Sequence, residues 1–247
     1  MKALILRFDG VLMSFGGFIV DQHGFTEPFP GASMLTGLAA NALGWSHGDF
    51  DKLEDMQRRI IYAARWDEEP RAIIDYHTVD LGQNKMRYPG WTTRGIPEHR
   101  TGGDAARYGT HQRYRHYWTD GLMTVALGLG DEAAHPTLLE LYEAFKTPAR
   151  PLFLGRKACL PSRPLLDPEA PILEGDDILE ILSKAPVWKR DGTVVAEGRK
   201  CWANWPAELD VSLRAQVREV YDLRDWRNQV VHGPSFRAEG YIGGAST

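Results

Sequence analysis

A long stretch from Asp80 to Trp118 constrains this chain more than any other feature, because it has neither a helical nor a strand period. Loops longer than about 12 to 15 residues are uncommon in compact domains, and most of those that exist are functional or disordered. This stretch mixes glycine with Lys, Arg and His and holds six aromatic residues, unlike a disordered linker. Cations attract phosphate and aromatic faces stack on unpaired bases, so the mixture favours single-stranded nucleic acid, RNA in the first place.

The charge of this region supports the same interpretation. From Arg71 to Trp118 there are eight Lys or Arg and four Asp or Glu, a balance of +4, whereas the whole chain carries −4 and the remainder therefore −8. A basic segment on an acidic body is typical of a surface that attracts an anionic partner. Arg and Tyr also occur in solvated loops and protein interfaces, so a protein contact stays open as an alternative. The candidate RNA contacts here are Arg87, Trp91, Arg94, Arg107, Arg113, Arg115 and His116.

The composition is that of an ordinary globular protein. A chain of 247 residues that is 43% hydrophobic is long enough for one large or two small domains. Arg7 and Asp9 interrupt the apolar run at the start, so we predict neither a signal peptide nor a spanning helix, and expect a cytoplasmic protein without membrane contact. Cys159 and Cys201 lie far apart without CxxC or histidine neighbours, which argues against a structural zinc or a disulfide scaffold. Walker, HExxH and paired-carboxylate motifs are absent from the sequence, so we expect no metal and no cofactor.

Hydrophobic periodicity predicts an α+β protein. The expected elements are a strand over 3–8, a helix between Pro30 and Gly44, a helix that begins with a capping box of Ser46 and Asp49, a strand over 60–66 in a hairpin with 73–79, a half-buried strand over 123–129, a helix from Pro136 to near Pro148, and a strand over 151–154. This order is the ferredoxin-like split βαβ plan, which is also the plan of RNA-recognition modules.

Two N-terminal places suit an anionic ligand. Ser14, Phe15, Gly16 and Gly17 supply backbone freedom and exposed amides, so a phosphate can approach the main chain there, although a tight connection explains the glycines more simply. Ser33 lies at the positive N-terminal end of the helix that follows Pro30, where a nucleic-acid backbone would be attracted. Core packing is the commoner cause of the small residues along that helix.

Four segments, in this order along the chain, resemble one known family. They are LILRFDGVLMSFGG at 4–17, PFPGASMLTGLAANALGW at 28–45, DYHTV at 75–79 and LFLGRKACLPSRPL at 152–165. Together they resemble the CasD subunit of the type I-E CRISPR surveillance complex, Cascade. The similarity covers roughly residues 2 to 166, with a weaker echo in REVYDLRD at 218–225. Each segment alone is unspecific, and the resemblance depends on all four occurring together in the family's order.

The resemblance implies a RAMP-type, RNA-recognition-like domain over 1–166 that a long β-hairpin, or thumb, interrupts at about 80–118. Residues 167–247 would form a small β-rich extension. The family's role implies an antiviral subunit that holds the 5′ handle of CRISPR RNA, caps one end of Cascade, and contacts its backbone subunit and its large subunit. Gly155, Arg156 and Lys157 match the family's glycine and paired cations after a strand, a place suited to an RNA phosphate. Segment 14–17 and Ser33 match parts near the handle, but Gly31-Ala32 stands where the family often has a polar or basic residue, which excludes a cationic contact there.

Catalysis is the main alternative to binding. Relatives in another CRISPR subtype cut precursor RNA without a metal through Tyr, Lys and His, types that this chain offers in Tyr76, His77, His116 and Lys157. Tyr76 and His77 belong to the motif shared with type I-E, where another subunit cuts, so we expect no catalytic residue. Both are candidate RNA contacts, and a hydrogen-bonded structural role stays open for His77. A metal-independent endoribonuclease and a pure protein-assembly module stay open as alternatives.

Overall fold

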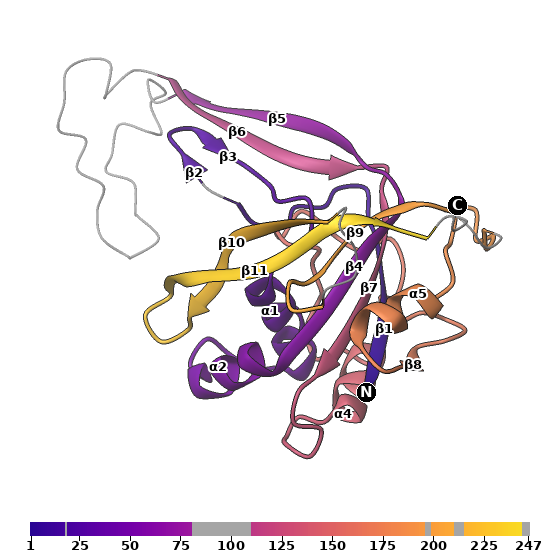
Figure 1. The fold of residues 1–247 in the computed structure, drawn as a ribbon. Coiled ribbons are helices and arrows are strands. Elements are labelled where there is room, and N and C mark those ends of the chain that lie inside the picture. The colour runs from indigo at the N-terminus through magenta and orange to yellow at the C-terminus, as the bar shows by residue number, and fades with distance from the viewer. Residues whose placement is uncertain (18, 81–109, 196–198, 210–214, 244–247) are drawn as a thin grey trace.

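The computed structural model describes residues 1–17, 19–80, 110–195, 199–209 and 215–243. These residues form a mixed α+β fold made mostly of strands (Figure 1). Its elements are β1 (Lys2–Asp9), β2 (Ile19–Val20), β3 (His23–Gly24), α1 (Ala32–Leu43), α2 (Phe50–Arg59), β4 (Ile60–Glu68), β5 (Arg71–Asp80), β6 (Thr110–Thr119), β7 (Leu122–Leu129), α4 (Leu138–Lys146), β8 (Ile172–Glu174), α5 (Ile178–Lys184), β9 (Cys201–Pro206), β10 (Gln216–Asp225) and β11 (Val230–Ile242). Among the described helices, none is long and apolar enough to cross a membrane.

Seven strands form the main sheet, in the order β10-β11-β9-β4-β7-β1-β8, and neighbouring strands are antiparallel. β1 confirms the strand predicted over 3–8, and every residue from Ala3 to Asp9 is buried. Leu4 and Leu6 pack in a core that α1, α2 and α4 share, whereas Ile5 packs in a second core with α5. Because helices cover both faces, β1 is a nearly continuous apolar run in the sequence.

β7 lies between β4 and β1 in the main sheet, and it corrects the half-buried strand predicted over 123–129. All eight of its residues are buried. Its small residues lie on the face that α5 covers: Ala126 packs in the same cluster as Ile178, and a Cβ on Gly128 would lie 2.6 Å from the Met1 side chain. Large and small residues therefore alternate along β7 because its two buried faces differ: the large side chains face the core shared with α1, α2 and α4, and the small ones face α5. The alternation does not mark a solvated face.

The predicted hairpin between 60–66 and 73–79 is wrong. The strand over 60–66 exists as β4, but β4 pairs with β7 and β9 in the main sheet. β5 pairs instead with β6 along its whole length, in a second sheet of order β2-β3-β6-β5. Both edges of the largely buried β4 are occupied by core strands, so the chain leaves the main sheet near Pro70 and β5 is exposed from Arg71 to Val79.

The end of the stretch that we expected to lack a period is strand β6, from Thr110 to Thr119. Its alternation is hidden in the sequence because both faces carry polar or aromatic side chains. Arg113 and Arg115 lie on one face, and Tyr114 and His116 on the other.

Three predicted boundaries also differ from the structure. α2 begins after Asp49, whose carboxylate accepts hydrogen bonds from the Ser46 amide and hydroxyl at 2.8 and 2.9 Å, so Ser46 precedes the cap. α4 begins after Thr137, which forms a capping box with Glu140, and Pro136 lies before the cap. Residues 151–154 are not a strand: Leu154 donates to the Cys159 carbonyl in a turn. The helix predicted to end at Gly44 is confirmed as α1.

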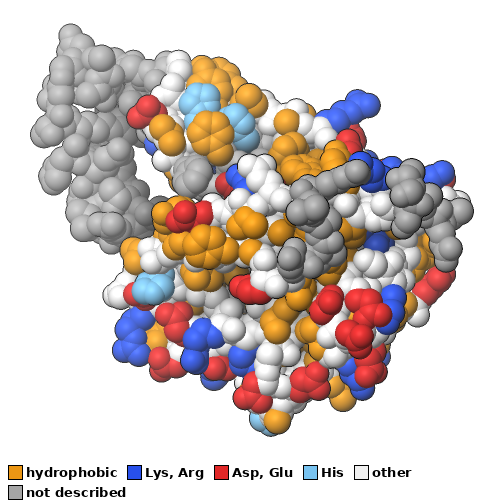
Figure 2. All heavy atoms as spheres, in the orientation of Figure 1, with side chains coloured by type: hydrophobic (Ala, Val, Ile, Leu, Met, Phe, Trp, Pro, Cys, Tyr) orange, Lys and Arg blue, Asp and Glu red, His pale blue; other side chains and the backbone are white. Residues whose placement is uncertain are grey.

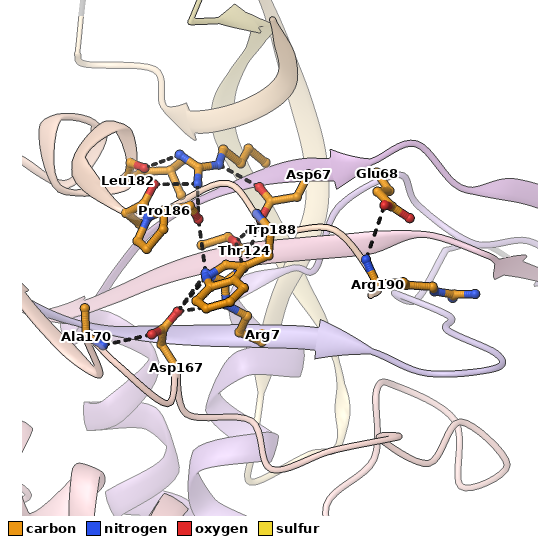
Figure 3. A network of polar contacts seen from close by, with 12 residues as sticks. Arg7, Asp67, Glu68, Thr124, Asp167, Ala170, Leu182, Pro186, Trp188 and Arg190 are labelled. Carbon is orange, nitrogen blue, oxygen red and sulfur yellow. Dashed lines mark hydrogen bonds and ion pairs between the residues drawn. The ribbon is translucent and has the colours of Figure 1, made fainter. Parts of the chain in front are cut away.

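A buried ion network joins the residues after Leu166 to the main sheet (Figure 3). Arg7 of β1 donates to Asp167 at 2.7 Å and to Asp67 of β4 at 3.0 Å, and Trp188 Nε1 donates to Asp167 at 3.2 Å. Burial lowers the pKa of Arg7, and the charges of Asp67 and Asp167 oppose that shift. After this network, β8 pairs with β1, and β9 pairs with β4. The division into 1–166 and 167–247 stays a prediction.

Candidate nucleic-acid interface

The second sheet is anchored to the main body at one end of β6. Met13 and Trp118 exchange two backbone hydrogen bonds of 2.8 Å, and Trp118 Nε1 donates to the Glu27 carbonyl at 2.7 Å. From this anchor β5 and β6 extend away from the main sheet (Figure 1). Both faces of their outer part are therefore solvated, which suits a surface that receives a partner.

One face of this sheet carries four stacked rings, which we call the ring column: Tyr76, Tyr114, His23 and Phe25. Tyr76 is opposite Tyr114 in the β5–β6 pairing, and His23 is opposite Tyr114 in the β3–β6 pairing, so the three side chains share a face. Consecutive ring centroids are 4.9, 4.6 and 5.7 Å apart, with interplanar angles of 29°, 9° and 15°. Figure 2 shows hydrophobic and histidine side chains gathered over β3, β5 and β6.

His116 adjoins the ring column. Its Nε2 lies 3.3 Å from His23 Nδ1, and its ring centroid lies 4.7 Å from that of Phe25. Partial burial, then the charges of His23 and Arg156, lower the pKa of His116. Because the contact between the two nitrogens needs one donor and one acceptor, the pair excludes a state in which both imidazoles are charged.

Arg156 holds the strands beneath the ring column together. Its guanidinium donates to the carbonyls of His116 at 3.0 Å and Gly24 at 2.9 Å, and it lies 4.9 Å from the Tyr117 ring centroid. The carboxylates of Asp9 and Glu174 pair with other cations, Arg163 and Lys2 respectively. Much of the donor capacity of Arg156 is thus used inside the protein, and a role in phosphate binding stays a prediction.

Glycine is required at position 155 because the segment around it lies directly against the backbone of Ser14. The φ of Gly155 is +101°, and a Cβ at this position would lie 1.6 Å from the Ser14 carbonyl oxygen. Ser14 N donates to Leu154 O at 3.0 Å, which joins the two segments that the sequence had suggested as phosphate sites. The side chains of Ser14 and Phe15 are buried, whereas Gly16, Gly17 and Lys157 are exposed. Phe15 packs between Phe8 and Trp66, and its backbone N–H donates to Thr26 Oγ1 at 2.9 Å, so neither its ring nor its amide is available to a ligand.

The opposite face of β5 and β6 is charged. His77 Nε2 lies 2.6 Å from Asp75 Oδ2, and Arg115 and Arg113 are the partners of Asp75 and His77 in the pairing. All four side chains are exposed. The structure therefore separates candidates that the sequence had grouped: Tyr76 and His116 lie on the aromatic face, and His77, Arg113 and Arg115 lie on the charged face.

Ser33 lies outside the second sheet. It lies in the first turn of α1, where Asp222 of β10 accepts a hydrogen bond from Ala32 N at 2.8 Å. A carboxylate of the protein thus already occupies the helix end at which we predicted an RNA phosphate. Arg87, Trp91, Arg94 and Arg107 lie outside the described residues. Sequence reasoning did not propose His23 and Phe25, since two-residue strands leave no periodic signal. Within the described part of the chain, no three His, Cys, Asp or Glu side chains converge as metal ligands would.

Comparison with known proteins then assigns the family. A family model described as CRISPR-associated protein (Cas_Cas5) matches residues 3–237. The chain belongs to this Cas5 family. The Cas5 assignment confirms the CRISPR-associated part of the resemblance seen in the sequence.

Two solved structures are similar to this Cas5 chain. One, titled "CRISPR RNA-guided surveillance complex", has a TM-score of 0.65 and 22% identity, and the match covers 98% of this chain and 90% of the other. The second, titled "Crystal structure of Cas protein", has a TM-score of 0.58 and 22% identity, with 98% and 94% covered. At this identity the matches establish the shared fold. Among curated proteins, none matches the chain.

Proposed function

We propose that this Cas5 protein is the CasD-type subunit of a type I-E surveillance complex, which holds the 5′ handle of CRISPR RNA in antiviral defence and does not cut it. Its place would be one end of the complex, in contact with the backbone subunit and the large subunit, in the cytoplasm. The RNA handle would lie against the second sheet.

The observation that carries this proposal is the ring column on an exposed sheet whose other face holds Arg113 and Arg115. Single-stranded nucleic acids are bound by aromatic rings that stack on bases, combined with cations along the backbone. A globular protein gains nothing for its own core from rings held at the surface, where Tyr76 is 51% and Phe25 is 38% exposed. A partner with flat aromatic groups and negative charge explains both faces.

The fold supports the same proposal. Strands β8-β1-β7-β4 are consecutive in the main sheet and antiparallel, which is the arrangement expected of a ferredoxin-like RAMP domain. β5 and β6 would be the two arms of the thumb, because they pair along ten positions and the segment between them joins their outer ends. One of the similar structures is an RNA-guided surveillance complex, which agrees with an RNA-bound assembly.

The His23–His116 pair is the observation that favours the second candidate, a metal-independent endoribonuclease. Such an enzyme needs a base at the 2′-hydroxyl and an acid or cation at the leaving oxygen, on either side of the phosphate. Here the two imidazole nitrogens contact one another at 3.3 Å, so the lone pair of one imidazole is engaged and the two nitrogens face each other instead of opposite sides of a phosphate. We therefore favour binding over cleavage.

The test uses the full chain assembled with the backbone and large subunits, and fluorescent RNA that carries either the handle or a scrambled sequence of the same length. We expect at least about tenfold tighter binding of the handle RNA, which stays intact on a denaturing gel. Equal and weak binding of both RNAs would support a protein-assembly module. Cleavage of repeat RNA by the wild-type chain that His116→Ala abolishes would establish the endoribonuclease.

A further inference from the structure

We propose that the outer face of Tyr76 is a stacking site for one unpaired nucleobase of the bound RNA. This inference rests on the proposed function and names the part of the second sheet at which a base is received.

A column of parallel rings offers full faces only at its ends. Tyr114 lies between Tyr76 and His23, and His23 lies between Tyr114 and Phe25, so the inner rings present edges to solvent. At one end, Phe25 is also in contact with His116, whose ring is tilted by 41° at 4.7 Å. At the other end, Tyr76 stands on β5, the last strand of the second sheet in the described structure, and is 51% exposed. Tyr76 is therefore the ring whose outer face is available.

The spacing of the column matches the spacing of the strands. Ring centroids 4.9 and 4.6 Å apart correspond to the roughly 4.7–4.9 Å between neighbouring strands, so the rings run across the sheet from β5 through β6 to β3. A base stacked on Tyr76 would take the next place in this row, beyond the edge of the sheet, where no strand of the described structure competes for the space.

The site is also held rigid before a ligand arrives. The register of β5 and β6 fixes Tyr76 opposite Tyr114, and Arg156 fixes β3 and β6 through the carbonyls of Gly24 and His116. A preorganised ring loses little conformational freedom on binding, so stacking energy is retained as affinity. The neighbours of Tyr76 on the same face of β5 are Ile74, which is apolar and 57% exposed, and Thr78, which is polar and exposed. The charged side chains of Asp75 and His77 lie on the opposite face, so the ring itself is the main contact that this site offers, and every base has a π face that can stack on it.

The test measures handle RNA affinity of the assembled complex, with RNA in which 2-aminopurine replaces one handle base at a time. Stacking on an aromatic ring quenches this base, so we expect one handle position to be quenched in the wild-type complex. Tyr76→Ala should remove that quenching and weaken binding about 5- to 100-fold. Tyr76→Phe should preserve both, because stacking does not need the hydroxyl. Tyr221→Ala is the matched control, a 55% exposed tyrosine on β10 of the main sheet, and should change neither.

The outcomes separate this inference from the proposed function. If the wild-type complex does not prefer the handle, the proposed function fails. If it prefers the handle but Tyr76→Ala binds and quenches like wild type, only the stacking site is overturned. Loss of complex assembly in Tyr76→Ala with unchanged RNA affinity would assign Tyr76 to a protein contact and would also overturn it. Tyr76→Leu, which keeps an apolar side chain on β5 without a ring, must show the same losses as Tyr76→Ala at an unchanged melting temperature.

Discussion

At the scale of single residues, the support beneath the ring column depends on close backbone packing more than on charge. Gly155 allows segment 154–157 to lie against Ser14, and Arg156 then reaches the carbonyls of β3 and β6. The sequence had suggested the glycine and the arginine as direct RNA contacts. In the structure, Gly155 and Arg156 hold in place the strands that carry the ring column.

Gly155→Ala should destabilise the protein by about 2–5 kcal/mol, because a positive φ costs an L-residue about 1–2 kcal/mol and overpacking typically adds about 1–3. Gly192→Ala is the control, since Gly192 also has a positive φ of +84° but a Cβ there would meet nothing within 4 Å. Urea denaturation of both variants measures the difference. Equal losses in the two variants would mean that the contact with Ser14 is not a steric limit.

His116 should give the protein a measurable pH dependence of stability. Its pKa in the folded state is lowered, chiefly by burial and then by His23 and Arg156. The unfolded chain therefore binds the proton more readily between the lowered pKa and the ordinary value of about 6.5, so stability falls as the pH drops through that window and is retained above it. We expect a smaller fall in melting temperature from pH 7.5 to 5.5 in His116→Gln than in wild type. His47 is exposed, so the melting temperature of His47→Gln should fall as much as that of wild type. An equal fall in all three proteins would contradict the assignment of this pH dependence to His116.

At the scale of elements, the β5–β6 hairpin presents two chemically different faces. Strand geometry places Tyr114 on one face and its sequence neighbours Arg113 and Arg115 on the other. An RNA that uses both faces must pass around the edge of β5, with a base on one side and phosphates on the other.

Arg113→Gln with Arg115→Gln should reduce the salt dependence of handle binding. Each phosphate contact contributes about 0.7 to the slope of log affinity against log salt for a single strand, so two lost contacts should lower it by about 1.4. Arg58→Gln, an exposed arginine of α2, is the control and should leave the slope unchanged. An unchanged slope in the double variant would show that the charged face meets a protein or solvent.

Among the strands of the main sheet, β1, β4 and β7 were predicted from the sequence, whereas β8 to β11 were not predicted individually and the pairing of the second sheet was missed. α1 and α4 are recognisable because one buried face imposes a period on the sequence, and β1 is recognisable as a short apolar run because both of its faces are buried. β5 was predicted as a strand over 73–79, but it is exposed on both faces, so the sequence does not fix its pairing. β6 carries polar or aromatic side chains on both faces, so no period distinguishes it from a loop. For the same reason the candidate site was found only in part: Tyr76 and His116 were named from the sequence, whereas their contacts with His23 and Phe25 depend on tertiary structure.

At the scale of the whole molecule, one buried network connects β1 and β4 with residues 167–188. Arg7 and Arg65 lie with Asp67 and Asp167 beneath α5, with side chains that are almost fully buried (Figure 3). The charges balance, and backbone carbonyls of 182, 185 and 186 accept the remaining arginine donors.

Asp167→Asn should destabilise the whole protein by about 3–5 kcal/mol, because it leaves Arg7 with an unbalanced charge in the interior. Glu174→Gln is the control: it removes one partner of the exposed Lys2–Glu174 pair, which is 4.0 Å long, and should have a far smaller effect. The free energy of unfolding in urea measures both. A loss for Asp167→Asn no larger than that of the control would show that the network does not hold the C-terminal segment.

Ultraviolet crosslinking of CRISPR RNA in the assembled complex, followed by mass spectrometry of the crosslinked peptides, tests the central claim most directly. If this Cas5 protein holds the handle on its second sheet, handle nucleotides will crosslink to peptides from β5 and β6, with Tyr76 as a modified residue. Handle crosslinks confined to other subunits, or to parts of this chain outside β3, β5 and β6, would contradict that account.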